Sequence, residues 1–115
     1  MPCENLHLTA VEVKHDPLIH CFGYLIRTSK HHFFFGGDSA AIPAAVLQLL
    51  LDKKIDTIYQ DVTYEHGWES TCHGTLEGLC NQVPAEFREK VICMHLGSDI
   101  CSKIDAAGFR VAQTI

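Results

Sequence analysis

The sequence predicts an α/β domain with a mixed β-sheet and helices on one face of that sheet. Two observations lead to this fold class: the first third of the chain holds three strand-like runs joined by turns, and the rest alternates strand-like with helical runs. Strands joined by tight turns pair antiparallel, whereas strands separated by helices pair parallel, so the sheet is mixed. At 115 residues and 47% hydrophobic composition, we expect one domain over 1–115.

Three strands are expected first. Apolar and β-branched residues dominate 6–14, 22–28 and 31–36. The polar break at Ser29 and Lys30 predicts a hairpin between the second and third strands.

In the middle of the chain the spacing of apolar residues changes from strand-like to helical. In 43–53 the apolar residues recur at helical spacing, and Pro43 suits the first turn of a helix, where its missing N–H costs nothing. A short strand is expected at 56–60, and a second helix at about 75–81 after a loop with Gly, Trp and Ser.

The last third continues the alternation. Pro84 is expected to begin a short helical turn before a strand at 90–95. Ser98 suits the N-cap of a helix that Gly108 ends, and a last strand is expected at 109–114.

Composition excludes several classes of protein. The net charge of −5 argues against a general surface for nucleic acid or acidic membrane. No stretch approaches the roughly 20 apolar residues of a membrane span, and the first residues lack the pattern of a signal peptide. We therefore expect a cytoplasmic protein with no membrane partner.

The six cysteines form no CxxC pair, so most of them are expected to be reduced. Cys93 lies within an apolar run, which is typical of a buried thiol. A thiol-based alternative would use Cys93, or Cys72 beside His73, but sequence neighbours rarely point at each other.

Three side chains of metal-ligand type each follow a strand-like run: His15, Asp38 and His95. A side chain at a strand end is held rigidly, and carboxylate and imidazole are both zinc ligands. The alternatives are a turn in which Asp38 or Ser39 caps the next helix, and ordinary structural histidines.

Asp61 and His73 flank the loop before the second helix. An acid beside an imidazole orients and charge-stabilises it as a general acid. Hydrogen bonding within the loop is the alternative for this pair.

Six segments, in this order, carry a family resemblance: LTAVEVKH, FGYLIRT, FFFGGDSA, IDTIYQDVTYE, CHGTLEGL and VICMHLGSD. Together they resemble the C-terminal half of the metallo-β-lactamase superfamily, closest in layout to its ribonuclease Z and phosphodiesterase branches. The resemblance implies that His15, Asp38 and His95 are ligands of a two-metal Zn or Mn site, with Asp38 bridging. It also implies that Asp61 stands for the Glu of a HEATF motif, and that His73 is similar to the HST histidine that assists the leaving group.

The same resemblance implies half of an αββα sandwich, because the HxHxDH signature of the N-terminal half does not occur in this sequence. The function implied is the C-terminal half of a metal-dependent hydrolase, inactive alone, in which metal-bound hydroxide cleaves a phosphodiester or related ester. Its partner would be a separate N-terminal half, and a nucleic acid or another phosphodiester its substrate. The alternative is a non-catalytic truncated or interaction domain that homodimerises through its open sheet face.

Overall fold

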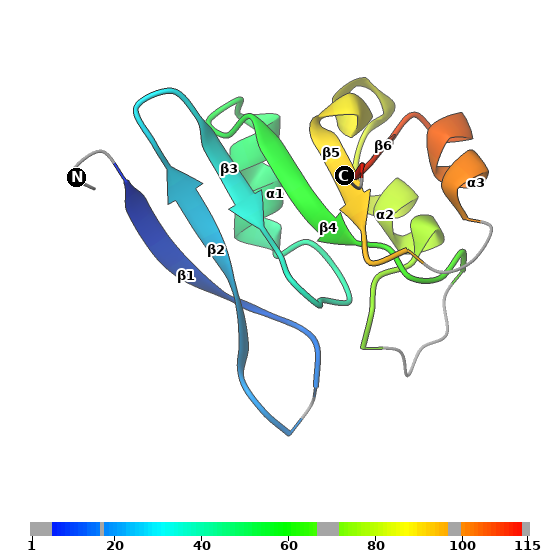
Figure 1. Ribbon diagram of the computed structural model, residues 1–115, viewed down its shortest axis with the longest axis horizontal. Helices are drawn as coiled ribbons and strands as arrows, with labels where there is room; N and C mark the ends of the chain where they lie inside the picture. The colour runs from blue at the N-terminus through cyan, green and yellow to red at the C-terminus, as the bar shows by residue number, and fades with distance from the viewer. Residues whose placement is uncertain (1–5, 17, 67–71, 97–99, 114–115) are drawn as a thin grey trace.

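A computed structural model describes residues 6–16, 18–66, 72–96 and 100–113. They form one six-stranded mixed sheet in the order β1-β2-β3-β4-β5-β6 (Figure 1). The strands are β1 (His7–Val13), β2 (Cys21–Arg27), β3 (His32–Phe35), β4 (Thr57–Asp61), β5 (Val91–Met94) and β6 (Arg110–Val111). The first three pair antiparallel and β3 to β6 pair parallel, as the sequence predicts.

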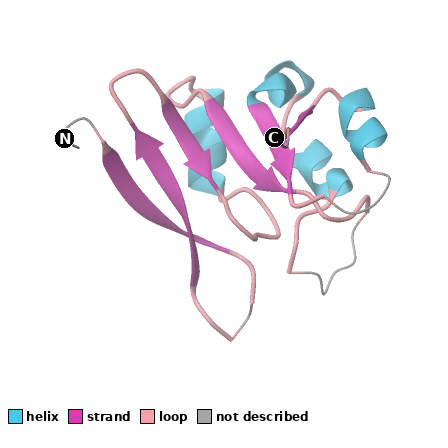
Figure 2. Cartoon of the chain, in the orientation of Figure 1, coloured by secondary structure: helices cyan, strands magenta, loops and turns pink. Residues whose placement is uncertain are grey.

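The helical elements are α1 (Ala44–Leu51), α2 (Leu76–Gln82), the 3₁₀ helix η1 (Ala85–Lys90) and α3 (Cys101–Ala106). Helices α1 and α2 lie on one face of the sheet (Figure 2). Thr75 begins α2 by accepting a hydrogen bond from the Gly78 amide. The predicted fold class, an α/β half-sandwich with helices on one face, is confirmed.

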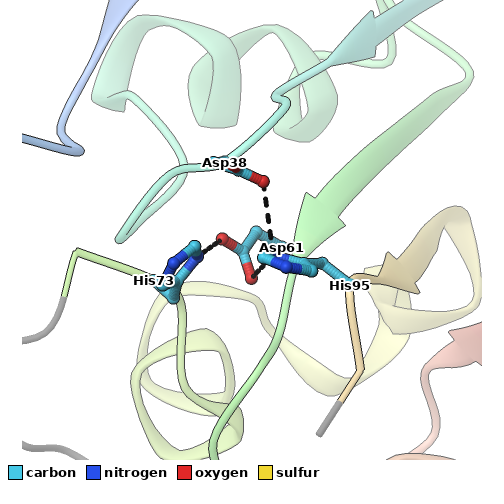
Figure 3. Close-up of side chains that lie close together, drawn as sticks. All are labelled: Asp38, Asp61, His73 and His95. Carbon is cyan, nitrogen blue, oxygen red and sulfur yellow. Dashed lines mark hydrogen bonds and ion pairs between the residues drawn. The ribbon is translucent and has the colours of Figure 1, made fainter.

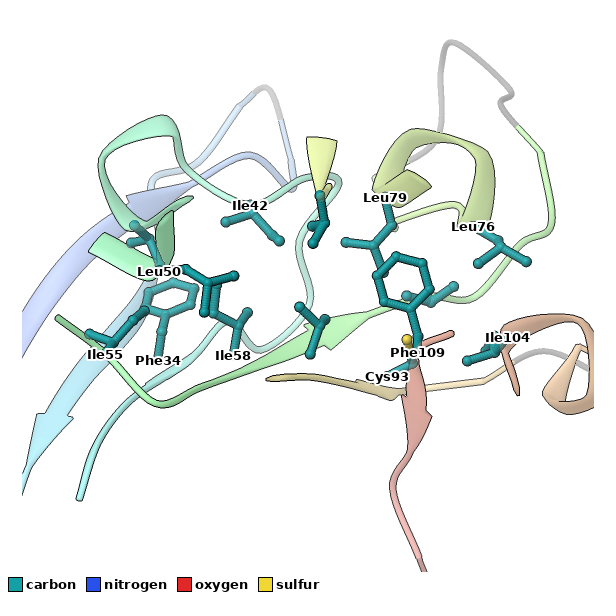
Figure 4. Close-up of a cluster of buried hydrophobic side chains, with 14 of the residues drawn as sticks. Phe34, Ile42, Leu50, Ile55, Ile58, Leu76, Leu79, Cys93, Ile104 and Phe109 are labelled. Atoms are coloured by element: carbon teal, nitrogen blue, oxygen red, sulfur yellow. The ribbon is translucent and has the colours of Figure 1, made fainter. Parts of the chain in front are cut away.

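The hydrophobic core lies between the sheet and these helices (Figure 4). Phe34 and Ile58 project into it from β3 and β4, Leu50 from α1 and Leu79 from α2. Contacts between apolar side chains of the strands and of the helices hold α1 and α2 on this face of the sheet.

The opposite face of the sheet is apolar and open. Direct cross-strand partners share a face, so Leu8, Phe22, Tyr24 and Phe35 all project away from the core. Their exposed fractions are 61%, 50%, 44% and 43%. Within the part of the chain that the structure describes, no helix covers them.

Element boundaries differ from prediction where backbone or packing intervenes. The strand predicted at 90–95 ends at Met94, because His95 has a positive φ of 57°. The last strand is only Arg110–Val111; Phe109, which precedes it, is buried in the core, and residue 114 lies outside the described residues. Ser98, the predicted cap, lies outside the described residues.

Five cysteines are free thiols in the described segments: Cys21, Cys72, Cys80, Cys93 and Cys101. Cys93 is buried, as predicted, and Cys3 lies outside the described residues. Over the described ranges, every helix is too short or too polar to cross a membrane.

Candidate metal centre

Four polar side chains meet at the edge of the sheet where β3, β4 and β5 end (Figure 3). Asp38 follows β3, Asp61 is the last residue of β4, and His95 directly follows β5. His73 reaches the same point from the segment before α2. Because β3, β4 and β5 are parallel, their carboxyl ends lie together, which brings distant parts of the sequence into one cluster.

The distances within this cluster are short enough for a metal ion. One ligand atom from each of Asp38, Asp61, His73 and His95 lies within 4.8 Å of all the others. His95 Nδ1 is 3.2 Å from Asp38 Oδ1 and 3.5 Å from Asp61 Oδ1. Asp38 and His95 are about half exposed, so the cluster is open to solvent on one side.

Asp61 is fully buried, and its carboxylate is surrounded by donors. Oδ2 accepts from the Ser39 amide at 3.1 Å and from His73 Nδ1 at 2.6 Å, and Oδ1 accepts from the Thr63 hydroxyl at 2.7 Å. A buried charge of this kind is stable only when hydrogen bonds replace its water. Asp61 is therefore a fixed, negatively charged anchor for the His73 ring.

His73 is oriented by this contact. Since an ionised carboxylate can only accept, Nδ1 of His73 carries the proton in the hydrogen bond to Asp61. The ring lies 4.7 Å from that of His95 and 5.2 Å from that of His15, centroid to centroid. The predicted pairing of Asp61 with His73 is thus present, while its catalytic role stays a prediction.

His15 lies beside the cluster but is not among the four side chains with mutually close ligand atoms. Its Nδ1 is 2.9 Å from the carbonyl oxygen of Cys72. A carbonyl only accepts, so Nδ1 donates and Nε2 keeps its lone pair, the tautomer that a metal ligand needs. The structure thus brings His15 to the site, and its role as a ligand also stays a prediction.

Thr63 links the two sides of the site, and sequence reasoning missed it. Its hydroxyl oxygen is 2.7 Å from Asp61 Oδ1 and 2.9 Å from the carbonyl oxygen of His95. His95 itself adopts the left-handed backbone region, which is uncommon for a residue with a side chain and concentrates at functional sites. The sequence points to Thr63 only by its position, two residues after Asp61.

The interpretation of Asp38 or Ser39 as a helix cap is wrong. Pro43 occupies the N-cap of α1 and no side chain caps this helix. Ser39 is buried and its amide donates to Asp61 instead. The Asp38 carboxylate is consequently left facing His95.

The loop between β3 and α1 is tied down on both sides. The Ala40 amide donates to the Lys14 carbonyl at 2.7 Å. The Gln82 carboxamide makes two hydrogen bonds with the backbone of Ile42, at 2.9 and 3.1 Å. These three hydrogen bonds therefore fix the backbone of the loop at Ala40 and Ile42, on the α1 side of Ser39.

The donor set suits a divalent metal ion. Imidazole nitrogen and carboxylate oxygen are the usual ligands of Zn²⁺, and both also bind Mn²⁺. Asp38 and His95 present their donor atoms toward one point, and His15 is in the correct tautomer beside it. The residues present therefore fit a metal ion, although they are too few for two completely coordinated ions.

Comparisons with known proteins place the chain in a family. A family model described as "Anti-Pycsar protein Apyc1" matches residues 1–112. A comparison with curated proteins finds no match.

Three solved structures share the fold. The metallo-β-lactamase fold protein YhfI from Bacillus subtilis superposes with a TM-score of 0.69 at 12% identity, over 99% of this chain and 49% of its own. A diphosphatase from the PhnP family gives 0.65 at 19% identity, over 98% and 43%. Zn²⁺-bound PqqB from Methylobacterium extorquens gives 0.67 at 14% identity, over 97% and 50%.

The chain spans about half the length of the solved structures it matches. At these identities the likeness shows a shared fold, which is that of the metallo-β-lactamases. With a family model covering nearly all of its length, the chain belongs to the anti-Pycsar Apyc1 family.

Proposed function

We propose that this chain is the C-terminal half of a metal-dependent hydrolase that cleaves a phosphodiester or related ester. The observation that carries the proposal is the convergence of Asp38, Asp61, His73 and His95 within 4.8 Å at the carboxyl edge of the sheet. The similar folds of a diphosphatase and of a zinc-bound protein support it.

In this proposal His15, Asp38 and His95 would hold the metal, Zn or Mn. When bound, the metal supplies an activated water and a positive charge beside the reacting ester. Asp61 is given the role of orienting His73 rather than that of a ligand, because its fully buried carboxylate accepts from His73 Nδ1 and from the Ser39 amide.

His73 then protonates the leaving oxygen. The Asp61 carboxylate holds Nδ1 at 2.6 Å and stabilises the charged imidazolium, so the proton on Nε2 is the one to be given up. Once it has donated, the neutral ring keeps its orientation through the same hydrogen bond. This is the division of labour between an orienting acid and a proton-donating histidine.

The isolated chain is proposed to be inactive. Three ligands would be too few for two metal ions, because catalytic zinc usually has three protein ligands of its own. The missing ligands would come from a separate N-terminal half, since the sequence has no HxHxDH segment.

A phosphodiesterase assay tests this. The purified chain is incubated with bis(p-nitrophenyl) phosphate and Mn²⁺ or Zn²⁺, and p-nitrophenolate release is followed. We expect a rate equal to that of a His73→Ala Asp38→Asn control. Metal-dependent turnover that this control lacks would show that the 115-residue chain carries a complete site.

A second function, a non-catalytic domain that homodimerises, is favoured by one observation. The open face exposes Leu8, Phe22, Tyr24 and Phe35 together, and contiguous apolar patches usually mark an interface. A second copy would supply the missing layer of the sandwich.

Light scattering tests this second function. A dimer at micromolar concentration that Phe35→Lys dissociates, and that Leu18→Lys leaves intact, supports it. Leu18 is a matched control because it is exposed but precedes β2 rather than lying on the open face. A wild-type monomer throughout the concentration range counts against it.

A further inference from the structure

Gln60, the residue before Asp61 on β4, has a carboxamide buried beneath the candidate metal centre. It is 1% exposed. Its Nε2 lies 3.1 Å from the hydroxyl oxygen of Ser39, 3.3 Å from the Ser39 carbonyl oxygen and 3.3 Å from the Asp61 carbonyl oxygen. The two N–H groups of this amide therefore serve three acceptors, two of which belong to the same residue.

The oxygen atom of the same carboxamide is left unsatisfied. Gln60 Oε1 is buried and has no hydrogen-bond partner among the described residues. Turning the amide over would not help, because Oε1 would then face two backbone carbonyl oxygens, which only accept. An orphaned buried carbonyl oxygen is destabilising, but the N–H groups of the same amide serve three buried acceptors, which would lose this donor if the side chain were apolar. Gln60 therefore fixes Ser39 while its own carbonyl oxygen stays unsatisfied.

What Gln60 holds is the residue next to the Asp38 carboxylate. Gln60 fixes the hydroxyl and carbonyl of Ser39, and Asp61 fixes its amide at 3.1 Å. Two consecutive residues of β4 thus clamp every polar group of Ser39. The preceding residue, Asp38, is thereby set 3.2 Å from His95 Nδ1.

We propose that Gln60 is a positioning residue, which through Ser39 sets the place of the Asp38 carboxylate and so the affinity of the site for a divalent cation. The proposal rests on the proposed function, since it assumes that Asp38 is a ligand. Residues that orient metal ligands without touching the metal typically affect metal affinity by about 10–100-fold.

The test compares Gln60→Met with Gln82→Met, using Co²⁺ alone as the probe. Gln82 is the matched control: it clamps the same loop by two hydrogen bonds, but at Ile42, on the side away from the carboxylate. Both variants should lose stability in thermal unfolding. We expect Gln60→Met to weaken Co²⁺ binding about 10–100-fold and to alter the visible absorption of the bound ion, and Gln82→Met to stay within about threefold of wild type with an unchanged spectrum.

Equal Co²⁺ affinity and spectrum in Gln60→Met and wild type would overturn the proposal, as would an equal loss in both variants. If Gln60→Met does not fold, Gln60→Asn replaces it; this variant withdraws the carboxamide by one methylene, and the same weakening is expected.

A readout without metal separates this inference from the proposed function. If wild type takes up no Co²⁺, the proposed function fails. Amide hydrogen exchange of Ser39 in the metal-free protein then decides the positioning role: faster exchange in Gln60→Met than in Gln82→Met supports it, and equal exchange overturns it.

Discussion

At the scale of single residues, the site depends on close backbone approach. Gly74 follows His73, and a Cβ at this position would lie 2.0 Å from the Asp61 carbonyl oxygen and 3.3 Å from that of Ser39. The Gly74 carbonyl also accepts from the Thr63 amide at 3.0 Å. Only glycine lets the segment that carries His73 lie this close to β4.

We therefore predict that Gly74→Ala destabilises the chain by about 2–4 kcal/mol, because two backbone segments must separate. Urea denaturation measures this. Gly37→Asn is the control: open space surrounds Gly37, and Asn tolerates its positive φ of 64°. Equal stability of Gly74→Ala and wild type would show that the close approach is not required.

Cys93 gives a second residue-scale prediction. Burial, with a smaller contribution from the nearby Cys80, raises the pKa of the Cys93 thiol to about 12 from an ordinary value of 9.0. Cys93 should therefore resist iodoacetamide at pH 8 in the native protein and react after unfolding. The exposed Cys101 should react in the native protein. Site-resolved mass spectrometry measures both reactions.

The raised pKa of Cys93 also determines the direction in which the free energy of unfolding changes with pH. Between about pH 9 and pH 12 the unfolded chain loses this proton while the folded chain keeps it, so the free energy of unfolding falls as pH rises through that window. Rapid labelling of native Cys93 would contradict both statements and would reopen the thiol-based alternative.

At the scale of elements, one side chain joins the helices behind the sheet. Arg88 of η1 donates to the carbonyls of Cys80 and Val83 at the end of α2, at 3.2 and 3.0 Å, and to that of Ala107 after α3, at 3.1 Å. Its guanidinium also lies 5.3 Å from the centre of the Phe109 ring. The guanidinium thus supplies hydrogen-bond donors at the C-terminal ends of α2 and α3, which lack capping side chains.

We predict that Arg88→Ala lowers the free energy of unfolding by about 3 kcal/mol, since three backbone carbonyls lose their donor. Lys103→Ala is the control. Lys103 pairs with Glu65 at 2.5 Å and lowers the pKa of that carboxyl, but the pair is exposed and should contribute little. Thermal unfolding of the two variants compares them; equal melting temperatures would contradict the role given to Arg88.

At the scale of the whole molecule, the sequence predicts the sheet, its mixed topology and the placement of helices, because hydrophobic period and turn residues report local structure. It also predicts Asp38 and His95 at strand ends, since parallel strands bring such ends together. The contacts made by side chains across the fold could not be predicted: the hydrogen bond from His15 to a backbone carbonyl, the three donors around Asp61, and the Gln60 carboxamide under Ser39. These depend on which segments become neighbours in space.

The whole molecule also presents two incomplete surfaces. The proposed metal ligands are too few for two ions, and within the described residues no helix covers the sheet face bearing Phe22, Tyr24 and Phe35. Both deficits correspond to a chain about half as long as the folds it matches. A partner half that brought both a second sheet and the remaining ligands would remove them together.

The central claim is that Asp38 and His95, aided by His15, form a metal site in this chain. Titration with Mn²⁺, followed by electron paramagnetic resonance of the free ion, tests it most directly, because Mn²⁺ avoids the thiols.

We predict saturable binding that Asp38→Asn weakens at least about tenfold, by loss of a charged ligand. Asp105→Asn, an exposed acid on α3, should leave it unchanged. Absence of Mn²⁺ binding, or equal binding by wild type and Asp38→Asn, would contradict the claim.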